Sequence, residues 1–293
     1  MSQFFGVYPA LVSPLQEHGG INATVVKELV DWQLDCGVHG FYICGGTGEG
    51  LLLSPDERKQ MLEATVAAAD GRGKVIAHVA ALDTATAMDL AAHAEANGAD
   101  AVAAIPPIYY RVDNQGLLEH YRLIAGASKL PLFLYHIPAM TQQPLSADLM
   151  KQLLSIDTFR GIKFSDYNHF LMRFLSKLGD DVVIFSGNDE VFLSGLTMGA
   201  DGGIGLTYNF MPRVYVGIYE AFRSADFATA RKLQQTSADL IEIMMEVYGM
   251  GVAKAALEHL GFEVGLPRRP LRPLSDLERG LLAEKLDSLG LVR

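Results

Sequence analysis

The segment Asn97-Gly98-Ala99-Asp100-Ala101-Val102 decides the fold, because a related phrase occurs at two other places in the chain. In each copy a glycine follows a stretch of helical pattern, and such a glycine takes the left-handed conformation that ends a helix. Glycine, alanine and β-branched residues follow within a few positions, so each copy predicts a helix, a cap and a buried strand in succession. The other copies are Cys36-Gly37-Val38-His39-Gly40-Phe41 and Met198-Gly199-Ala200-Asp201-Gly202-Gly203.

Eight strands are expected from segments of this kind. Most are short apolar runs without alternation, which is typical of strands buried on both faces. The expected strands cover residues 7–13, 40–46, 75–82, 101–108, 132–138, 160–165, 182–189 and 202–209.

Helical patterns lie between the strands. Ser54-Pro55-Asp56-Glu57 is a capping box that opens a helix over 57–69, and 84–97 and 146–154 are similar. The glycine caps recur with a spacing of roughly 25 to 30 residues per unit, which fits a (β/α)8 TIM barrel, an α/β fold. A doubly wound open sheet is the rival, but it usually needs a Gly-rich phosphate turn after the first strand, and residues 14–16 supply none.

A change in pattern divides the chain into two expected domains, a barrel over 1–224 and a C-terminal helical domain over 225–293. Strand signals stop after about residue 224, and 228–245, 252–260 and 275–289 have helical patterns. Three prolines, at 267, 270 and 273, make 261–273 a connector that cannot be helical throughout.

Composition excludes several classes of partner. With 24 Lys+Arg against 34 Asp+Glu the net charge is −10, which opposes binding to nucleic acid or to an anionic membrane. No apolar run approaches the ~20 residues that span a bilayer, and residues 1–5 carry no basic signal region, so we expect a cytoplasmic protein. Its two cysteines, Cys36 and Cys44, are too few for a disulfide framework, and we expect ordinary packing roles for them.

Lys163 is the sharpest candidate for chemistry because it lies inside an expected barrel strand. Burial disfavours the charged form of a lysine, and a free amine can form a Schiff base with a ketone. Tyr135, on the neighbouring strand, could place a phenol beside that amine and move protons to and from a substrate hydroxyl. The alternatives are a lysine that reaches the rim or pairs with Asp189 or Glu190, and a tyrosine whose hydroxyl binds backbone.

Other polar residues follow the ends of strands, where barrel enzymes keep their active sites. The loop 45–49 offers backbone N–H groups and the Thr47 hydroxyl to a carboxylate or phosphate, although the glycines alone indicate only a tight turn. Tyr109 and Tyr110 could be an exposed aromatic pair, and Asp189 with Glu190 could either hold sugar hydroxyls or cap a helix. His78 and His136 have no metal-ligand spacing around them, so we predict no metal site and core or supporting roles for both.

Five motifs together resemble the N-acetylneuraminate lyase and dihydrodipicolinate synthase family. They are GGTGE at 45–49, YHIPAMT at 135–141, GIKFS at 161–165, GNDE at 187–190 and GGIGLTYN at 202–209, in the family's order and nearly from end to end of the chain. The resemblance implies a (β/α)8 barrel with C-terminal helices, a homotetramer, and a class I pyruvate-dependent aldolase that needs no cofactor or metal.

The resemblance also implies roles for single residues. Lys163 matches the lysine that forms the Schiff base, Tyr135 the catalytic tyrosine, and Thr47 the hydroxyl residue that binds the carboxylate and relays the proton. Tyr109 matches a tyrosine that reaches into the active site of the adjacent subunit. The expected substrate-binding residues are Gly46, Thr47, Ser165, Gly187, Asp189, Glu190 and Gly205.

Within this family the motifs favour cleavage of N-acetylneuraminate or a related 2-keto sugar acid to pyruvate and an aldose. The GNDE segment matches the one that contacts the polyol tail in sialic acid lyases, whereas Met140 replaces the arginine that dihydrodipicolinate synthases need for a second carboxylate. Gly46 and Leu206 each stand where those lyases usually have a serine. A 2-keto-3-deoxy sugar acid aldolase or dehydratase is therefore the main alternative. A metal-dependent class II aldolase and a non-catalytic binding protein are alternatives from other classes.

Overall fold

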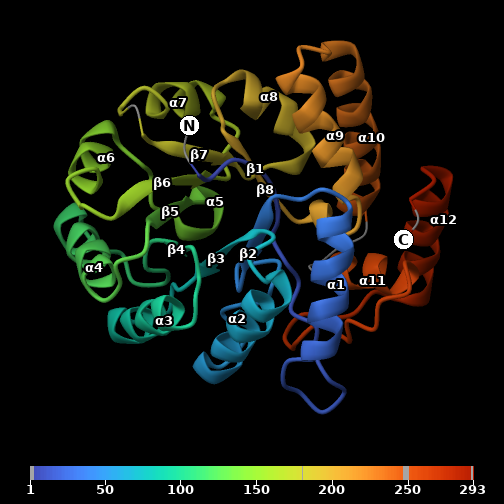
Figure 1. Cartoon of the computed structure of the whole chain (residues 1–293), viewed down its shortest axis with the longest axis horizontal. Coiled ribbons are helices and arrows are strands. Elements are labelled where there is room, and N and C mark those ends of the chain that lie inside the picture. Colours follow the sequence, from blue (N-terminus) through green and yellow to red (C-terminus); the bar gives the residue numbers. More distant parts are fainter. Residues whose placement is uncertain (1–2, 180, 247–250, 292) are drawn as a thin grey trace.

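Eight parallel strands form a barrel with helices around its outside (Figure 1). The computed structural model describes residues 3–179, 181–246, 251–291 and 293. Hydrogen-bonded strands follow the order β1-β8-β7-β6-β5-β4-β3-β2. The strands are β1 (Gly6–Pro9), β2 (Gly40–Ile43), β3 (Lys74–His78), β4 (Ala101–Ala104), β5 (Leu132–His136), β6 (Phe159–Phe164), β7 (Val183–Ser186) and β8 (Gly202–Gly205).

The ring closes between β1 and β2. Ala10 and Tyr42 form a parallel bridge there, and the Leu11 amide donates to the Tyr42 carbonyl at 2.9 Å. Below it the His39 amide donates to the Val7 carbonyl, also at 2.9 Å. The prediction of a TIM barrel, and not a doubly wound open sheet, is confirmed.

Seven of the strands end two to four residues earlier than the sequence predicts. The second strand, expected to run to residue 46, stops at Ile43 because the chain turns sharply after it. Cys44 has φ +57° and Glu49 has φ +56°, left-handed values that lie outside the β region. The apolar and small residues expected to extend the strands instead begin the loops at the carboxyl ends of the barrel.

The helices whose bounds the sequence predicts begin and end within two residues of those positions. The glycines of the recurring phrase, Gly37, Gly98 and Gly199, have φ of +92°, +81° and +100°, and both halves of the capping box at Ser54 are present. The helices of the barrel are α1 (Ala23–Asp35), α2 (Pro55–Ala69), α3 (Thr84–Ala96), α4 (Asn114–Gly126), α5 (Pro138–Thr141), α6 (Ala147–Leu153), α7 (His169–Leu175), α8 (Phe192–Thr197) and α9 (Pro212–Arg223).

Three more helices follow the barrel, as predicted: α10 (Phe227–Glu246), α11 (Val252–His259) and α12 (Asp276–Ser288). Helix α10 packs along α9 and also reaches the loop after β7 (Figure 1). Residues 261–273 contain no helix, as the prolines predict. The division into 1–224 and 225–293 stays a prediction, but the contacts of α10 bring the C-terminal helices to the carboxyl ends of the strands.

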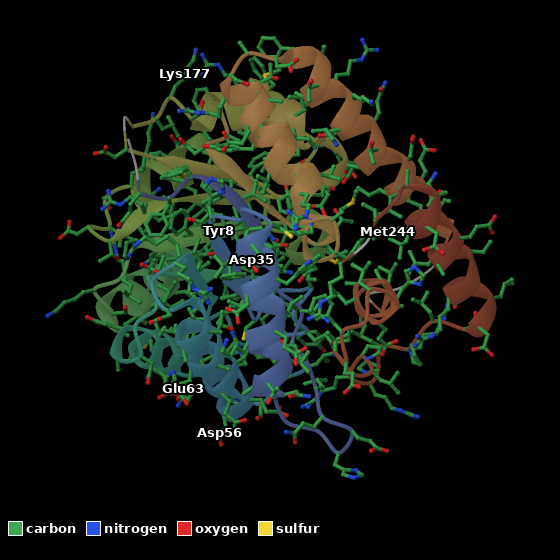
Figure 2. All side chains as sticks on the ribbon, turned by 45° about the vertical axis from the view of Figure 1, so that its right-hand side comes forward. Tyr8, Asp35, Asp56, Glu63, Lys177 and Met244 are labelled. Atoms are coloured by element: carbon green, nitrogen blue, oxygen red, sulfur yellow. The ribbon has the colours of Figure 1, made fainter. Side chains whose placement is uncertain are left out.

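Aromatic side chains fill the interior of the barrel on the amino-terminal side of the predicted site. The Phe133 ring packs against Phe185 at 5.9 Å between centroids, and Phe185 packs against Tyr8 at 4.9 Å. Figure 2 shows Tyr8 within the molecule and the exposed Lys177 at its periphery. Because side chains alternate along a strand, Tyr135 points the same way as Phe133, one layer nearer the carboxyl end. Tyr135 and the predicted reactive Lys163 therefore lie in the layer of side chains next to this aromatic layer, on the side of the carboxyl ends of the strands.

Candidate active site

Lys163 and Tyr135 meet inside the barrel. They are paired residues of β6 and β5, and the Lys163 side chain is buried, with 5% of its surface exposed. Its Nζ lies 3.8 Å from the centre of the Tyr135 ring and 4.9 Å from that of Tyr42. No ion pair within the described ranges involves Lys163, so the alternative of a lysine paired with a carboxylate finds no support. The amine is held by aromatic faces and by burial.

Tyr42 and His78 complete this layer, and the sequence did not single out either for chemistry. Their rings lie 6.0 Å from each other, and each lies 6.0 Å from the Tyr135 ring. The His78 Nδ1 lies 3.0 Å from the Cys44 carbonyl oxygen, which fixes Nδ1 as the protonated nitrogen. Burial, helped by the charge of Arg58, lowers the pKa of His78 to about 3, so the imidazole is neutral. Strand alternation could have predicted that both side chains point inward, but not how close Tyr42 lies to Lys163.

The loop after β2 brings Thr47 and Gly46 to the mouth of the barrel. Thr47 is half-buried and Gly46 exposed, with no atom within 4 Å of where a Cβ would lie. Gly50, by contrast, is required, since its Cβ would fall 1.7 Å from the Cys44 carbonyl oxygen. The sequence predicted this tight turn correctly.

A buried ion pair closes the same loop from the C-terminal side. The Lys254 Nζ of α11 lies 2.8 Å from Glu49 Oε1, with 3% of each side chain exposed, and the Arg268 backbone N–H donates to the other carboxylate oxygen. Burial lowers the pKa of Lys254, while its carboxylate partner opposes this shift. The Glu49 carboxylate therefore holds the loop after β2 in place, and it is not available to bind a substrate. Sequence reasoning missed Lys254, because nothing in a helix so far from Glu49 along the chain marks it as the partner.

Asp189 is buried at the end of β7, against the last strand. Its Oδ2 accepts from the Thr207 backbone N–H at 2.7 Å and from the Thr207 hydroxyl at 2.6 Å. A Cβ on Gly205 would lie 2.2 Å from Asp189 Oδ1, so only glycine fits there. Burial raises the pKa of Asp189 to about 6, although both bonds from Thr207 lower it. The sequence named Asp189 and Gly205 but missed Thr207, although it lies in the quoted GGIGLTYN motif.

Ser165 and Gly187 touch each other across β6 and β7. The Ser165 hydroxyl donates to the Gly187 carbonyl at 3.4 Å, and a Cβ on Gly187 would lie 2.1 Å from that hydroxyl oxygen. Glu190 is half-buried and accepts a hydrogen bond from the exposed Tyr167 hydroxyl, which raises the pKa of Tyr167 to about 12. These residues continue the polar rim beyond the reactive layer.

Tyr109, another predicted catalytic residue, lies at the surface of the chain. Its side chain is 89% exposed, that of Tyr110 is 73% exposed, and their rings pack edge to face at 4.9 Å. Tyr109 also has φ +74°, which is strained for an aromatic residue. Among the described residues, no contact brings its phenol to Lys163.

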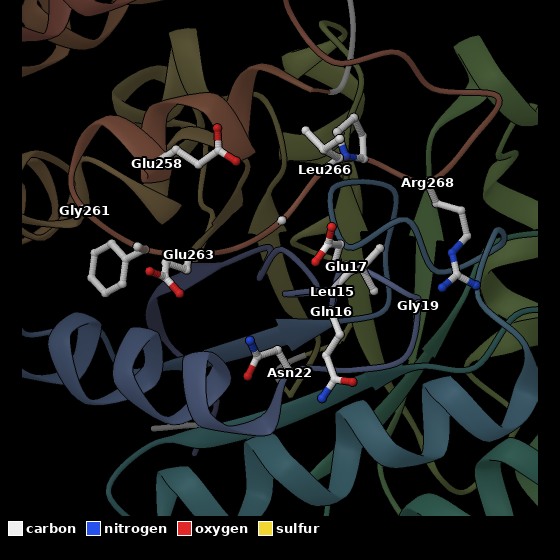
Figure 3. Close-up of a pocket in the computed structure, with 13 residues that line it drawn as sticks. Leu15, Gln16, Glu17, Gly19, Asn22, Glu258, Gly261, Glu263, Leu266 and Arg268 are labelled. Atoms are coloured by element: carbon white, nitrogen blue, oxygen red, sulfur yellow. The ribbon is translucent and has the colours of Figure 1, made fainter.

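A separate groove of about 810 Å³ lies between the β1–α1 loop and residues 261–268 (Figure 3). Glu17, Glu263 and Arg268 are among its lining residues, and none of the predicted site residues is. In the described part of the chain, no three His, Cys, Asp or Glu side chains gather as metal ligands would. No helix within the described ranges is both long and apolar enough to cross a bilayer.

Known proteins resemble the chain along almost its whole length. A model of the dihydrodipicolinate synthetase family matches residues 3–289. The N-acetylneuraminate lyase of Rhizobium meliloti is 36% identical over 279 residues, which cover 95% of this chain and 93% of that protein.

Solved structures give the same picture. The sialic acid aldolase of Ruminococcus gnavus has a TM-score of 0.95 and 32% identity and covers 99% of this chain and 98% of its own, and its catalytic lysine mutant matches equally well. A dihydrodipicolinate synthase of Bacillus anthracis has a TM-score of 0.93 and 28% identity, covering 98% and 99%. The choice between these activities therefore depends on the site and not on the fold.

Proposed function

The chain belongs to the dihydrodipicolinate synthetase family, as its motifs predict, and from that premise we propose that it is a class I lyase that cleaves N-acetylneuraminate to pyruvate and an aldose. The observation that carries the proposal is the Lys163 amine, buried in the barrel with the Tyr135 ring 3.8 Å away and in no ion pair among the described residues. A primary amine inside the barrel, beside a phenol, is placed to form a Schiff base with a ketone that enters from the mouth.

The mechanism follows from these two groups. The Lys163 Nζ attacks the keto carbon C2 of the substrate, water leaves, and a protonated imine forms. Tyr135 then takes the proton of the C4 hydroxyl while its own phenol proton passes through the Thr47 hydroxyl to the substrate carboxylate, which holds it until C3 is protonated. The C3–C4 bond breaks, and its electron pair moves into the imine to give an enamine and the free aldehyde. Protonation at C3 and hydrolysis by water release pyruvate and restore the amine. Neither a metal nor an organic cofactor takes part in this sequence.

The remaining predicted residues bind the two ends of the substrate. The Thr47 hydroxyl and the backbone at Gly46 and Gly205 receive the carboxylate end, beside Lys163. The sugar chain extends toward the ends of β7 and β8, where Asp189 and Glu190 accept from its hydroxyls and Ser165 and Gly187 form the wall between. Asp189 is suited to this, since its Oδ1 makes no hydrogen bond with another described residue.

Assembly and location complete the proposal. An 89% exposed tyrosine in a strained conformation supports a partner that covers it, so we infer a homotetramer in which Tyr109 enters the neighbouring site. Light scattering of the purified protein tests this. Both cysteines are free and buried, which supports a reducing, cytoplasmic location.

Reductive trapping tests the central claim. The protein is incubated with pyruvate and borohydride, and the modified peptide is mapped by mass spectrometry. A reduced pyruvoyl adduct on Lys163, together with release of pyruvate from N-acetylneuraminate, is the expected result. Binding of pyruvate without an adduct would overturn the imine mechanism and leave a binding protein, while loss of activity to a chelator would indicate a class II aldolase.

One observation favours a second candidate, a 2-keto-3-deoxy sugar acid aldolase or dehydratase. Gly46 and the half-buried Leu206 leave the site two hydroxyls short of what a long polyol acid would meet in a sialic acid lyase. A dehydratase would give a product with the full carbon skeleton and no free pyruvate. Synthesis of 4-hydroxy-tetrahydrodipicolinate is the weakest candidate, because Met140 is an exposed, uncharged side chain in α5.

A further inference from the structure

We propose that helix α10, which lies outside the barrel, positions the Asp189 carboxylate for the sugar end of the substrate through a chain of three buried hydroxyl groups. In this role Tyr215 of α9 and Ser237 of α10 are positioning residues that never touch the substrate. The inference rests on the proposed function and deepens it, since it names what sets the binding of the hydroxylated end.

The chain of hydroxyls is continuous. From Asp189 Oδ2 the first step is to the Thr207 Oγ1 at 2.6 Å, the second from there to the Tyr215 hydroxyl at 2.5 Å, and the third to the Ser237 Oγ at 2.5 Å. Thr207, Tyr215 and Ser237 are each at most 1% exposed. Solvent therefore cannot replace a missing member of the chain at low cost.

Counting protons gives the chain a direction. An ionised Asp189 can only accept hydrogen bonds, so the Thr207 hydroxyl donates its single proton to the carboxylate. Thr207 must then accept from Tyr215, and Tyr215 must accept from Ser237. All three O–H groups point toward the carboxylate, an arrangement in which each bond strengthens the next. The charge of Asp189 thus depends on the Ser237 hydroxyl, three hydrogen bonds away, in a helix that the barrel does not need for closure.

Helix α10 also holds the backbone of Asp189. The Gln234 side-chain amide donates to the Asp189 carbonyl at 3.1 Å and accepts from the Leu193 N–H at 2.8 Å. On the other side of the carboxylate, Gly205 has no side chain, and a Cβ there would lie 2.2 Å from Asp189 Oδ1. Ser237 and Gln234 lie three residues apart, so one face of α10 fixes both the main chain and the side chain of Asp189.

The charges around Asp189 make its protonation sensitive to this chain. Burial and the neighbouring Glu190 favour the neutral acid, whereas Lys163 and the Thr207 donors favour the carboxylate. Tyr208 and Tyr215 also face it, and burial holds the pKa of both phenols well above 10, so they stay neutral. Removing a hydroxyl from the chain weakens the hydrogen bonds that stabilise the ionised carboxylate of Asp189, and so favours its neutral form.

The test compares Tyr215→Phe and Ser237→Ala with Tyr208→Phe in the full chain. Tyr208 is an apt control, because its ring stacks on Tyr215 at 3.8 Å between centroids while its buried hydroxyl has no hydrogen-bond partner among the described residues. The measurements are kcat and KM for N-acetylneuraminate between pH 5 and 9, together with trapping of pyruvate on Lys163.

For Tyr215→Phe and Ser237→Ala we expect KM to rise about tenfold and the acid limb of kcat/KM to move to higher pH, with trapping unchanged. Tyr208→Phe should behave as the wild type. Wild-type KM and acid limb in Tyr215→Phe, or equal shifts in all three variants, would overturn the inference. Should Tyr215→Phe fail to fold, Ser237→Ala decides alone. A wild type that traps no pyruvate would instead refute the proposed function, and the inference with it.

Discussion

The two ends of the proposed site are built in different ways. At the keto-acid end, Lys163 and Tyr135 lie on adjacent strands in fixed register, and the Thr47 loop is closed by a buried ion pair with Lys254 of α11. At the sugar end, Asp189 lies in a loop after β7 and depends on neutral hydroxyls and on α10. Strand register fixes the position of the reacting atoms, while a hydroxyl chain adjusts a charge. The C-terminal helices serve both ends, by an ion pair at one and by hydrogen bonds at the other.

Lys163→Ala is the largest expected disturbance, and it acts on the keto-acid end alone. Loss of the amine removes the covalent step, so cleavage should fall at least about 10⁴-fold and trapping of pyruvate should disappear. The exposed Lys177 supplies the control, Lys177→Ala, which should keep full activity. Residual cleavage by Lys163→Ala near the wild-type rate would mean that the strand-built end is not where the chemistry occurs.

Lys254→Met tests how much the buried ion pair stabilises the loop at the keto-acid end of the site. The variant leaves Glu49 buried without its partner, which should lower the free energy of unfolding by about 3–5 kcal/mol and raise KM for the keto acid. The matched change is Lys27→Met, because Lys27 pairs with Asp31 at the surface, with 67% of its side chain exposed. Denaturant unfolding should detect almost no effect there. Equal losses in the two variants would show that burial of the pair is irrelevant.

The two ends should also respond to pH with opposite sign. His78, at the keto-acid end, has its pKa lowered to about 3, so the unfolded chain binds its proton first and stability is lost as pH falls below about 6.5. Asp189, at the sugar end, has its pKa raised to about 6, so the folded chain keeps its proton longer and stability is lost as pH rises from about 4 to 6.

Two variants separate the contributions of His78 and Asp189 to the change in unfolding free energy with pH. Relative to Asp189→Asn, the wild type should lose about 3 kcal/mol of unfolding free energy between pH 4 and 7. Relative to His78→Gln, it should gain stability over pH 5 to 6.5. Urea unfolding at a series of pH values measures both differences, and slopes of the same sign would remove the proposed contrast.

The same contrast explains how far the sequence could be interpreted. Strand and cap signals are local, so the barrel and the meeting of Lys163 with Tyr135 follow from the order of motifs. The ion pair of Glu49 with Lys254 joins residues far apart in sequence, and so does the hydroxyl chain from Asp189 to Ser237. Neither Lys254 nor Ser237 lies in a motif. An alanine-rich helix such as α11 gives no sign of which loop it will touch. Sequence therefore predicts the reacting groups better than what holds them.

Gly46→Ser and Leu206→Ser give the smallest and most selective test. A Cβ at Gly46 meets no atom within 4 Å, and no left-handed conformation opposes it, so the new hydroxyl can face the carboxylate at little cost. One hydrogen bond of about 0.5–1.5 kcal/mol should lower KM by roughly twofold to tenfold for pyruvate and for N-acetylneuraminate alike. Leu206→Ser lies at the sugar end and should lower KM only for the sugar acid, with some loss of stability because Leu206 packs on the core. Steady-state kinetics of cleavage and of the reverse condensation give both constants. If each serine lowered KM for both substrates equally, the site would bind its ligand as one unit, and the two ends would not be separable.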